Sequence, residues 1–446
     1  MKMKNLTEGN PVKLMLSFAL PVCIGNIFQL FYSLADTRIV GSVLGGNSLA
    51  AVGATTAIST LLIGFLQGLT NGFAIIAARS FGAKRWEELR KAAAGTLLLG
   101  GATTAAIMLP VLLGLKGILR LLNVPDELLQ EAYGYIFIVL AGMMITMLYN
   151  ACAGILRAIG DTTAPLLFLI CAAFLNVGLD ILFMAVLPLG VQGAALGTVL
   201  AQLVSVIFCF LYIWKKYPVF HLKKEDFRLE ISLVKQMYTS GMSMGMMMSL
   251  VFFGTLALQC AINTFGTEII VAHTAARKVS ELYFLPISVM GMTMATFCGQ
   301  NFGAGKYDRM KMGIKNALFI TWGWSVLVIL MSYTVAPFFV SMVTGSHEKI
   351  VIDTAVLYLK INAPFYFLAA GISIFRNALQ AVGDHKTPVI SSFIELLGKV
   401  LIAALLSPVL EYMGIIIAEP VIWILMIIPL VVKLVKNPVF RKGYLE

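Results

Sequence analysis

Charged residues are scarce in this sequence. Only 12% of its 446 residues are Asp, Glu, Lys or Arg, whereas 59% are hydrophobic. A soluble globular chain is about 25% charged, and the apolar excess here extends over the whole length. This composition therefore indicates a polytopic membrane protein that lies in the lipid bilayer.

Closely spaced metal ligands and cysteine pairs are also missing. The four histidines are scattered without an H-E-x-x-H pattern, and the six cysteines lie in apolar runs with no close pair. Such cysteines behave as small buried hydrophobes, so we predict no cofactor and no enzyme site. The net charge of +11 is typical of basic loops in a membrane protein, and we expect no nucleic-acid partner.

Long apolar runs recur along the chain and predict an all-α membrane protein. Each run is close to the roughly 20 residues that a membrane-spanning helix needs. The first run follows the short basic start Met1–Thr7 and shows no small-residue cleavage site, so we expect no cleaved signal peptide. Twelve spans are predicted, at approximately residues 14–37, 48–77, 91–115, 132–155, 164–187, 191–214, 236–263, 270–298, 315–343, 354–375, 387–407 and 412–433.

Basic residues gather in alternate loops between these spans. Lys and Arg are enriched in cytoplasmic loops, and a cytoplasmic N-terminus leaves Lys116, Arg120, Lys349 and Lys360 as the basic residues outside. We therefore expect both termini in the cytoplasm, which agrees with an even number of spans.

The sequence contains a weak internal repeat. Three short matches occur in the same order and at nearly constant spacing, and six spans per half make the halves parallel repeats about a central cavity. We predict an N-lobe at 1–214, a cytoplasmic inter-lobe loop at 215–235 and a C-lobe at 236–446. The matches are Leu49–Val52 with Ile270–His273, Arg79–Lys84 with Gln300–Gly305, and Leu156–Asp161 with Leu379–Asp384.

One carboxylate lies in an otherwise apolar span. The run from about Ala164 to Leu187 has Asp180 as its only charge, and Asn176 stands four residues before it. On a helix these two side chains share one face. An ionisable group in hydrocarbon costs at least about 2.5–3.5 kcal/mol and indicates a functional site.

Several further motifs occur in this chain: Tyr32 with Asp36, Phe81-Gly-Ala, Phe302-Gly-Ala-Gly, and Arg157-Ala-Ile-Gly-Asp161 with Pro165. In combination with Asn176 and Asp180 they resemble the MATE (multidrug and toxic compound extrusion) family over essentially the whole chain. The Asn176-x-x-x-Asp180 pattern looks most like the DinF-like branch. The resemblance implies antiport by alternating access, in which H⁺ or Na⁺ enters and small amphipathic, often cationic, drugs or metabolites leave. It also implies the plasma membrane of a prokaryote, and we expect a monomer.

Depth along the predicted helices brings four polar residues to one level. At about 1.5 Å per residue, Asp36 lies about 33 Å along the first helix from its inner end. Asp180 lies about 24 Å along the fifth, and Thr198 about 10 Å in from the outer end of the sixth. With Asn176 one turn below Asp180, oxygen ligands suited to Na⁺ would converge, or two close carboxylates would hold a proton. The family resemblance implies this coupling role for all four residues.

Simpler alternatives exist for these residues. Asp36 could pair with Arg38 at the interface, Asp180 could be a structural hydrogen-bonding partner, and Thr198 could bond the backbone of its own helix. Gln29 and Tyr32, which precede Asp36, could line the substrate cavity or serve as interhelical hydrogen-bonding groups.

The second half does not repeat this cluster, because Ala257, Lys399 and Ala403 stand opposite Asp36, Asn176 and Asp180. We therefore expect one cation site, in the N-lobe. Glu395, Lys399 and Glu419 are predicted to form an ion-paired trio in the C-lobe, with a net charge of −1. The trio could lock helices together or form a second proton or substrate site.

A flippase for a lipid-linked precursor is the main alternative function. It would require a strongly basic, hydrated central cavity, and the predicted spans contain few cations. Arg277 and Glu281 in the eighth span are expected to pair with each other, since they stand four residues apart.

Overall fold

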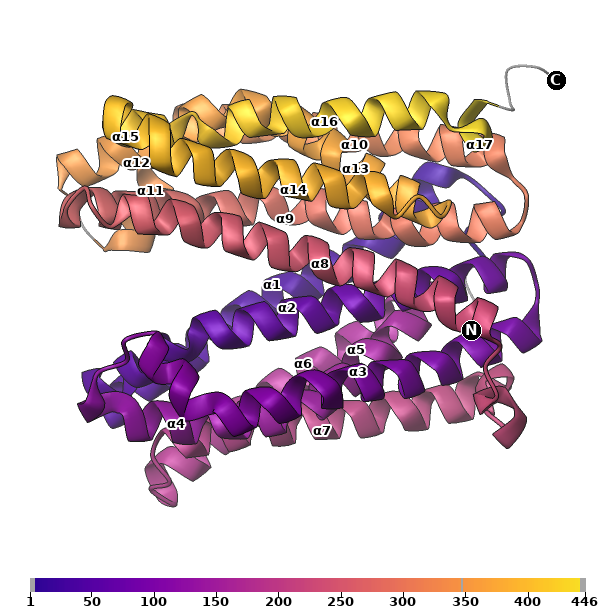
Figure 1. Ribbon diagram of the computed structural model, residues 1–446, viewed down its shortest axis with the longest axis horizontal. Helices are drawn as coiled ribbons and strands as arrows, with labels where there is room; N and C mark the ends of the chain where they lie inside the picture. The colour runs from indigo at the N-terminus through magenta and orange to yellow at the C-terminus, as the bar shows by residue number, and fades with distance from the viewer. Residues whose placement is uncertain (1–4, 346–347, 442–446) are drawn as a thin grey trace. The chain divides into compact units, whose positions relative to one another are not determined.

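The computed structural model describes residues 5–345 and 348–441, and within these ranges it contains helices and no β-strand. Residues 1–4 of the basic N-terminal start lie outside the described ranges. The helices of the first half (Figure 1) are α1 (Pro11–Leu44), α2 (Gly46–Gly82), α3 (Trp86–Leu121), α4 (Asp126–Ala141), α5 (Met143–Ala158), α6 (Thr163–Asp180), the π-helix η1 (Ile181–Val186), α7 (Val191–Lys216), and the 3₁₀ turns η2 (Pro218–Phe220) and η3 (Lys224–Phe227).

The second half begins with two long helices and continues with several shorter ones. They are α8 (Ile231–Ile262), α9 (Thr267–Gly303), α10 (Tyr307–Thr334), α11 (Ala336–Thr344), α12 (Lys349–Asn362), the 3₁₀ turn η4 (Ala363–Phe365), α13 (Tyr366–Ala381), α14 (Lys386–Leu401), the π-helix η5 (Ile402–Leu406), α15 (Ser407–Ile416), α16 (Ala418–Lys436) and α17 (Pro438–Arg441).

The number of membrane spans agrees with the prediction. Among the described residues, eleven helical segments are long and apolar enough to cross a bilayer, and α4 with α5 forms a twelfth candidate that is bent by 41°. Gly142 stands at this bend, where a Cβ atom would lie 2.4 Å from Cγ2 of Val199. The all-α membrane architecture is confirmed, with eleven candidate spans and a twelfth if α4 and α5 together form one span.

The repeat is visible in the turns between helices. Gly45, before α2, has φ 90° and its counterpart Gly266, before α9, has φ 89°. Gly160, before α6, has φ 82° and its counterpart Gly383, before α14, has φ 95°. This left-handed backbone is accessible to glycine without steric cost, so the same turns recur in both halves.

Several span boundaries in the second half differ from the sequence prediction. The run 315–343 is broken at Val335 between α10 and α11, and a 3₁₀ turn with Pro364 joins α12 to α13. The eleventh span continues through η5 and α15 to Ile416, so the twelfth begins at Ala418 rather than near residue 412. Prolines near these junctions lack a backbone N–H and interrupt the regular helix. Glu419 consequently lies in the first turn of α16.

The chain forms two compact units. The first contains residues 5 and 20–245, and the second contains residues 6–19 and 246–441. The start of α1 therefore belongs to the second unit, where Leu6 is fully buried. The Leu6 carbonyl accepts hydrogen bonds from Asn301 at 3.3 Å and from Arg309 at 3.2 Å, and its N–H donates to Gln300 at 2.9 Å.

The start of α8 belongs to the first unit and crosses α2 at very short range. The crossing is made by two glycine pairs with the small-xxx-small spacing, Gly68 with Gly72 and Gly241 with Gly245, which lets backbones approach closely. A Cβ atom on Gly72 would lie 2.5 Å from Cα of Gly241. At the same place the Ser240 hydroxyl donates to the Gly72 carbonyl at 2.8 Å.

A polar cluster holds the turn between α5 and α6. The Asp161 carboxylate accepts from the hydroxyls of Tyr212 at 2.8 Å and Tyr217 at 2.6 Å, and Lys216 lies 3.4 Å away. Burial by itself raises the pKa of Asp161, but hydrogen bonds from Tyr217, Tyr212 and the Ala164 N–H, with the charge of Lys216, hold that pKa below its usual range. The cluster therefore favours the ionised carboxylate.

Substitution of Gly72 tests the close crossing of α2 and α8. Gly72→Ala forces two backbones apart, and we expect a loss of about 1–3 kcal/mol of stability. Gly64→Ala is the matched control, because a Cβ there meets nothing within 4 Å. The apparent melting temperature of the purified protein in detergent should fall for Gly72→Ala alone; equal melting of both variants would contradict the crossing.

The Asp161 cluster predicts a pH-dependent part of stability. Because the folded pKa is lowered, the contribution is complete above the unfolded value of about 3.9 and is lost as the pH falls through the lower folded pKa. Asp161→Asn should cost roughly 1–3 kcal/mol at neutral pH, the size of a lost charge-assisted hydrogen bond. It should also flatten the acid limb of melting temperature against pH. An unchanged acid limb would show that Asp161 does not contribute.

Candidate functional site

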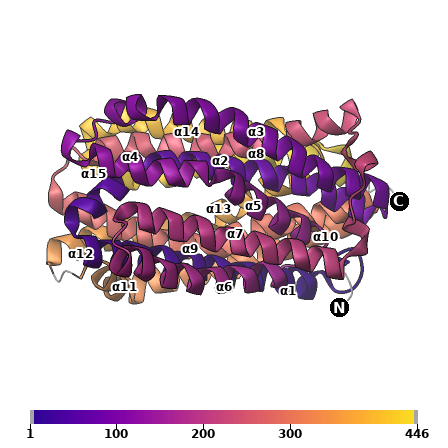
Figure 2. The ribbon, with the colours of Figure 1, turned by 90° about the horizontal axis from the view of Figure 1, so that it is seen from below.

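Three helices of the first unit bring the predicted polar residues together. Asp36 lies in the second half of α1, Asn176 and Asp180 end α6, and Thr198 lies in the first third of α7. Helices α6 and α7 run side by side (Figure 2). Asn176 and Asp180 are almost completely buried, at 1% and 0% exposure. They form a buried polar pair on one face of α6.

The Asn176 amide lies between Asp180 and Thr198. With its nitrogen facing the carboxylate, it donates to Oδ2 of Asp180 at 2.9 Å, and its oxygen accepts from the backbone N–H of Thr198 at 3.0 Å. The Tyr32 hydroxyl of α1 donates to Oγ1 of Thr198 at 3.3 Å. Thr198 also donates to the Ala194 carbonyl of its own helix at 3.1 Å, so the alternative proposed for this residue coexists with the shared network.

The carboxyl groups of Asp36 and Asp180 lie within hydrogen-bonding reach of each other. Two carboxylates at such range repel when both are ionised, so the arrangement is stable only with a proton or a metal cation between them. Oδ1 of Asp36 is buried and has no hydrogen-bond partner among the described residues. An orphaned buried oxygen of this kind is available to a cation.

The donor set fits a hard monovalent cation. It consists of two carboxylates, an amide oxygen and hydroxyls, which are the oxygen ligands that hard cations take. No cluster of three or more His, Cys, Asp or Glu side chains gathers anywhere in the described part of the chain. The residues therefore fit Na⁺ or H⁺ and do not form a transition-metal centre.

Gly197 provides the space for the Asp180 carboxylate. A Cβ atom at Gly197 would lie 2.4 Å from Oδ1 of Asp180. The position of the carboxylate thus depends on the missing side chain on the facing helix α7. Gly178, between Asn176 and Asp180 on α6, has nothing within 4 Å of an added Cβ.

A π-helix begins directly after Asp180. The segment η1 (Ile181–Val186) continues α6 with wider turns, and such segments are rare and frequently occur at functional sites. The second unit has a π-helix at the corresponding place, η5 (Ile402–Leu406), shortly after Lys399. Neither segment was predicted, since apolar residues give no signal that distinguishes π-turns from α-turns.

The remaining sequence candidates divide into those at the cluster and those away from it. Arg38 is exposed and forms no ion pair with Asp36 in the described chain, which removes that alternative partner. Gln29 is also exposed and has no polar contact with the cluster there. Tyr135 on α4 was missed: it lies near enough to Asp36 and Asp180 to sense their charges. A tyrosine in a span has no pattern that separates it from an ordinary packing residue.

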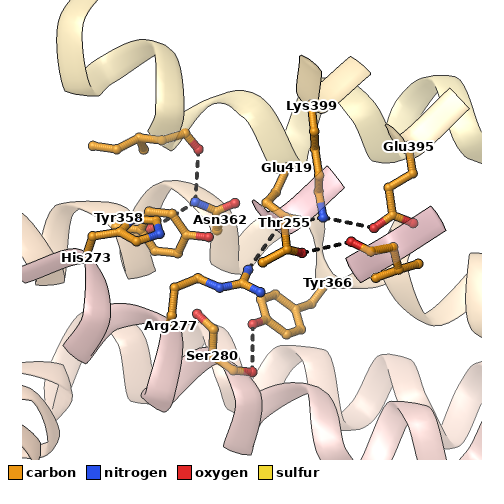
Figure 3. Close-up of polar contacts among 12 residues, drawn as sticks. Thr255, His273, Arg277, Ser280, Tyr358, Asn362, Tyr366, Glu395, Lys399 and Glu419 are labelled. Carbon is orange, nitrogen blue, oxygen red and sulfur yellow. Dashed lines mark hydrogen bonds and ion pairs between the residues drawn. The ribbon is translucent and has the colours of Figure 1, made fainter. Parts of the chain in front are cut away.

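In the second unit, Glu395, Lys399 and Glu419 lie together with two arginines (Figure 3 shows all but Arg376 by label). Lys399 pairs with Glu395 at 2.9 Å and with Glu419 at 3.6 Å. Arg277 of α9 pairs with Glu419 at 3.1 Å, and Arg376 of α13 pairs with Glu395 at 3.5 Å. We call these five residues the charge ladder.

The charge ladder differs from the predicted trio in its charge. Three positive and two negative side chains leave one positive charge, whereas the trio alone would carry −1. Arg277 was expected to pair with Glu281, but Lys278 makes that pair at 3.2 Å. Sequence spacing missed the true pairing because Arg277 and Glu419 come from helices far apart in the chain.

The sequence profile of the MatE family matches this chain twice, over residues 21–182 and 243–405. These two matches cover more than half of the chain and coincide with the two halves of the repeat.

Individual relatives are bacterial proteins named for multidrug resistance or multidrug export. The probable multidrug resistance protein YpnP of Bacillus subtilis is 28% identical over 70% of this chain and 69% of its own length. The probable multidrug resistance protein YoeA of the same organism is 26% identical, covering 90% and 89%. The multidrug export protein MepA of Staphylococcus aureus is 22% identical, covering 94% and 91%.

Solved structures share the fold. A crystal structure of MATE in complex with MaL6 superposes with a TM-score of 0.89 at 23% identity, covering 97% of this chain and 98% of that chain. A MOP superfamily transporter from Pyrococcus furiosus superposes with a TM-score of 0.85 at 23% identity, covering 100% and 97%. At this identity the likeness shows the fold alone.

Substitution of Gly197 tests the cation cluster. Gly197→Ala should displace the Asp180 carboxylate and weaken the binding of its cation by roughly tenfold, the usual cost of disturbing a residue that supports ligands. The measurement is the melting temperature of the purified protein. Its change with sodium chloride concentration at constant ionic strength reports Na⁺ binding, and its change with pH reports proton binding. Gly178→Ala is the matched control. If the titration curves of Gly197→Ala were the same as those of Gly178→Ala, the role of Gly197 would be contradicted.

Proposed function

Because this chain belongs to the MatE family of multidrug export transporters and is not an enzyme, we propose that Asp36, Asn176, Asp180 and Thr198 bind its coupling cation. The observation that carries the proposal is the contact between two carboxyl groups inside an apolar unit. Members of the family are ion-coupled, and this cluster brings two acidic side chains together within membrane-spanning helices of the first unit. The exported compounds would be small amphipathic, drug-like molecules.

We propose that the coupling cation is a proton in the described geometry. Two carboxyl groups in mutual contact share one proton, and this arrangement needs no further ligand. Na⁺ would compete for the same oxygens, with the orphaned Oδ1 of Asp36 as an added ligand. When bound, either cation supplies the positive charge that lets the two carboxylates lie close together.

Exchange follows from competition between two states of the first unit. With the cation bound, Asp36 holds α1 to α6; after the cation leaves, the two carboxylates repel and α1 is released. Tyr32 lies on α1 with Asp36, and its hydroxyl donates a hydrogen bond to Thr198 of α7. Release of α1 would therefore also break this hydrogen bond. Pro21 is the place where α1 can bend. Export requires only that cation and substrate favour different states.

The finer assignments rest on the same sequence patterns. We propose that the chain belongs to the DinF-like branch, because the Asp and Asn-x-x-x-Asp pattern stands in the first half only. The N-lobe 1–214 would carry the cation site, the loop 215–235 would connect it to the C-lobe 236–446, and both termini would lie in the cytoplasm of a prokaryotic cell. We propose a monomer, and Tyr32 with Gln29 as lining of the substrate path.

A flippase for a lipid-linked precursor is supported less well. Such a substrate carries several phosphate charges and calls for a strongly basic, hydrated surface. The charge ladder provides one surplus positive charge, and the exposed Lys278 is paired with Glu281.

Replacement of Asp180 tests the coupling role. Asp180→Asn removes the shared charge while keeping the shape, so we expect dye export from everted membrane vesicles to fall at least about tenfold under an imposed proton gradient. Substrate binding without a gradient should persist, because the residue acts on the cation. Asp353→Asn, which changes an exposed carboxylate on α12, is the matched control.

Three outcomes separate the possibilities. If a pH gradient drives export and Asp180→Asn loses it, the coupling cation is a proton. If only a sodium gradient drives export, the coupling cation is Na⁺ at the same residues. Gradient-driven export by Asp180→Asn at the wild-type rate and equal expression would refute the site.

A further inference from the structure

The charge ladder runs through the second unit as an alternating series with an arginine at each end. In order, its members are Arg376, Glu395, Lys399, Glu419 and Arg277, joined at 3.5, 2.9, 3.6 and 3.1 Å. Figure 3 labels the last four of them. Pairing alone would be complete with four residues. The fifth leaves one positive charge without a counter-charge, which is costly inside a membrane protein.

The surplus charge is accessible at the Arg277 end of the ladder. The side chains of Lys399 and Glu419 are 3% and 9% exposed, whereas that of Arg277 is 32% exposed. At the other end, Nε of Arg376 is buried and has no hydrogen-bond partner among the described residues. A ligand could therefore reach the ladder through Arg277.

The exposed part of α9 around Arg277 carries polar side chains beside the apolar Val271, Leu282 and Phe284, although α9 spans the membrane. Thr274 is exposed one turn before, and the side chains of Lys278 and Glu281 are 51% and 50% exposed. Charged side chains in membrane spans face protein or water rather than lipid. Lys278 and Glu281 pair with each other, so this face adds no net charge and leaves the surplus on the ladder.

The chemistry of Arg277 suits a carboxylate. A guanidinium presents five N–H donors in a planar fork that matches two carboxylate oxygens. The Glu419 carboxylate and the Tyr358 hydroxyl are its hydrogen-bonding partners within the described residues, and the charge of Glu281 also acts on it. Its remaining N–H donors can serve another ligand. Behind Arg277, the Lys399 side chain packs directly over Gly254. A Cβ atom added at Gly254 would lie 2.9 Å from Cδ of Lys399.

We propose that Arg277 binds a carboxylate group of the exported compound, with the ladder behind it supplying the surplus positive charge. The substrate class is then an amphiphile that carries a free carboxylate, alone or beside a cationic group. This proposal rests on the proposed export function, because the ligand is the exported compound. It assigns to the second unit a binding role that is separate from cation coupling in the first.

A matched pair of dyes tests this assignment. A rhodamine with a free benzoate and the ethyl ester of the same rhodamine differ only in the carboxylate, and fluorescence anisotropy measures their binding to the purified protein in neutral detergent. We expect the wild type to prefer the acid, and Arg277→Gln to lose roughly tenfold in affinity for the acid alone, as for one charge-assisted hydrogen bond. Unchanged ester binding shows that the variant is folded.

Charge variants sharpen the test. Glu419→Gln raises the surplus and should increase the preference for the acid, whereas Arg277→Lys should retain part of it. Lys436→Gln removes an exposed cation of α16 that lies outside the ladder and should leave the preference unchanged. Equal binding of acid and ester by the wild type, binding of neither dye, or an unchanged preference in Arg277→Gln would each overturn the proposal.

Two further comparisons separate this proposal from others. Loss of the preference on adding phosphatidylglycerol to the micelles would assign Arg277 to a lipid headgroup instead and overturn the substrate role. No ion gradient is applied, so the preference is measured without coupled export, and the control Asp353→Asn should keep the wild-type preference. Failure of gradient-driven export and failure of carboxylate recognition are therefore distinguishable.

Discussion

The low polarity of the bilayer is the constraint on which the structure depends. Hydrocarbon offers no hydrogen bonds to backbone or side chains, so every span is helical and nearly every buried charge has a partner. The two units meet this constraint differently. The first holds two carboxyl groups close together, which a cation would stabilise, and the second holds a ladder of paired side chains that keeps one surplus positive charge.

Small residues make both arrangements possible. Gly197 leaves space for the Asp180 carboxylate, and Gly254 leaves space for the Lys399 side chain. Glycines on α2 and α8 likewise allow two backbones to cross within the first unit. In each case the chain positions a polar or close contact by removing a side chain opposite it, which costs less than the burial of an unsatisfied group.

The repeat shows how one architecture can serve two chemistries. Both halves keep the same glycine turns and a π-helix in the second-to-last span of the half, although the residues before those π-helices differ. Asp180 precedes one and Lys399 the other. The backbone fold is therefore common to both units, while their local charges differ. We propose that this difference makes the first unit bind a cation and the second an anionic group.

The sequence by itself determined the all-helical class, the number of spans, the repeat and the face shared by Asn176 and Asp180. These follow from apolar run length and from spacing along one helix, which are local properties. Only the tertiary structure decided that Arg277 contacts Glu419, that Arg376 joins Glu395, and that Tyr135 lies near Asp36. Such contacts join helices distant in the chain, where the pairing depends on three-dimensional packing and on space left by residues such as Gly197. The net charge of the ladder, and with it the proposed ligand, could be read only after those contacts were known.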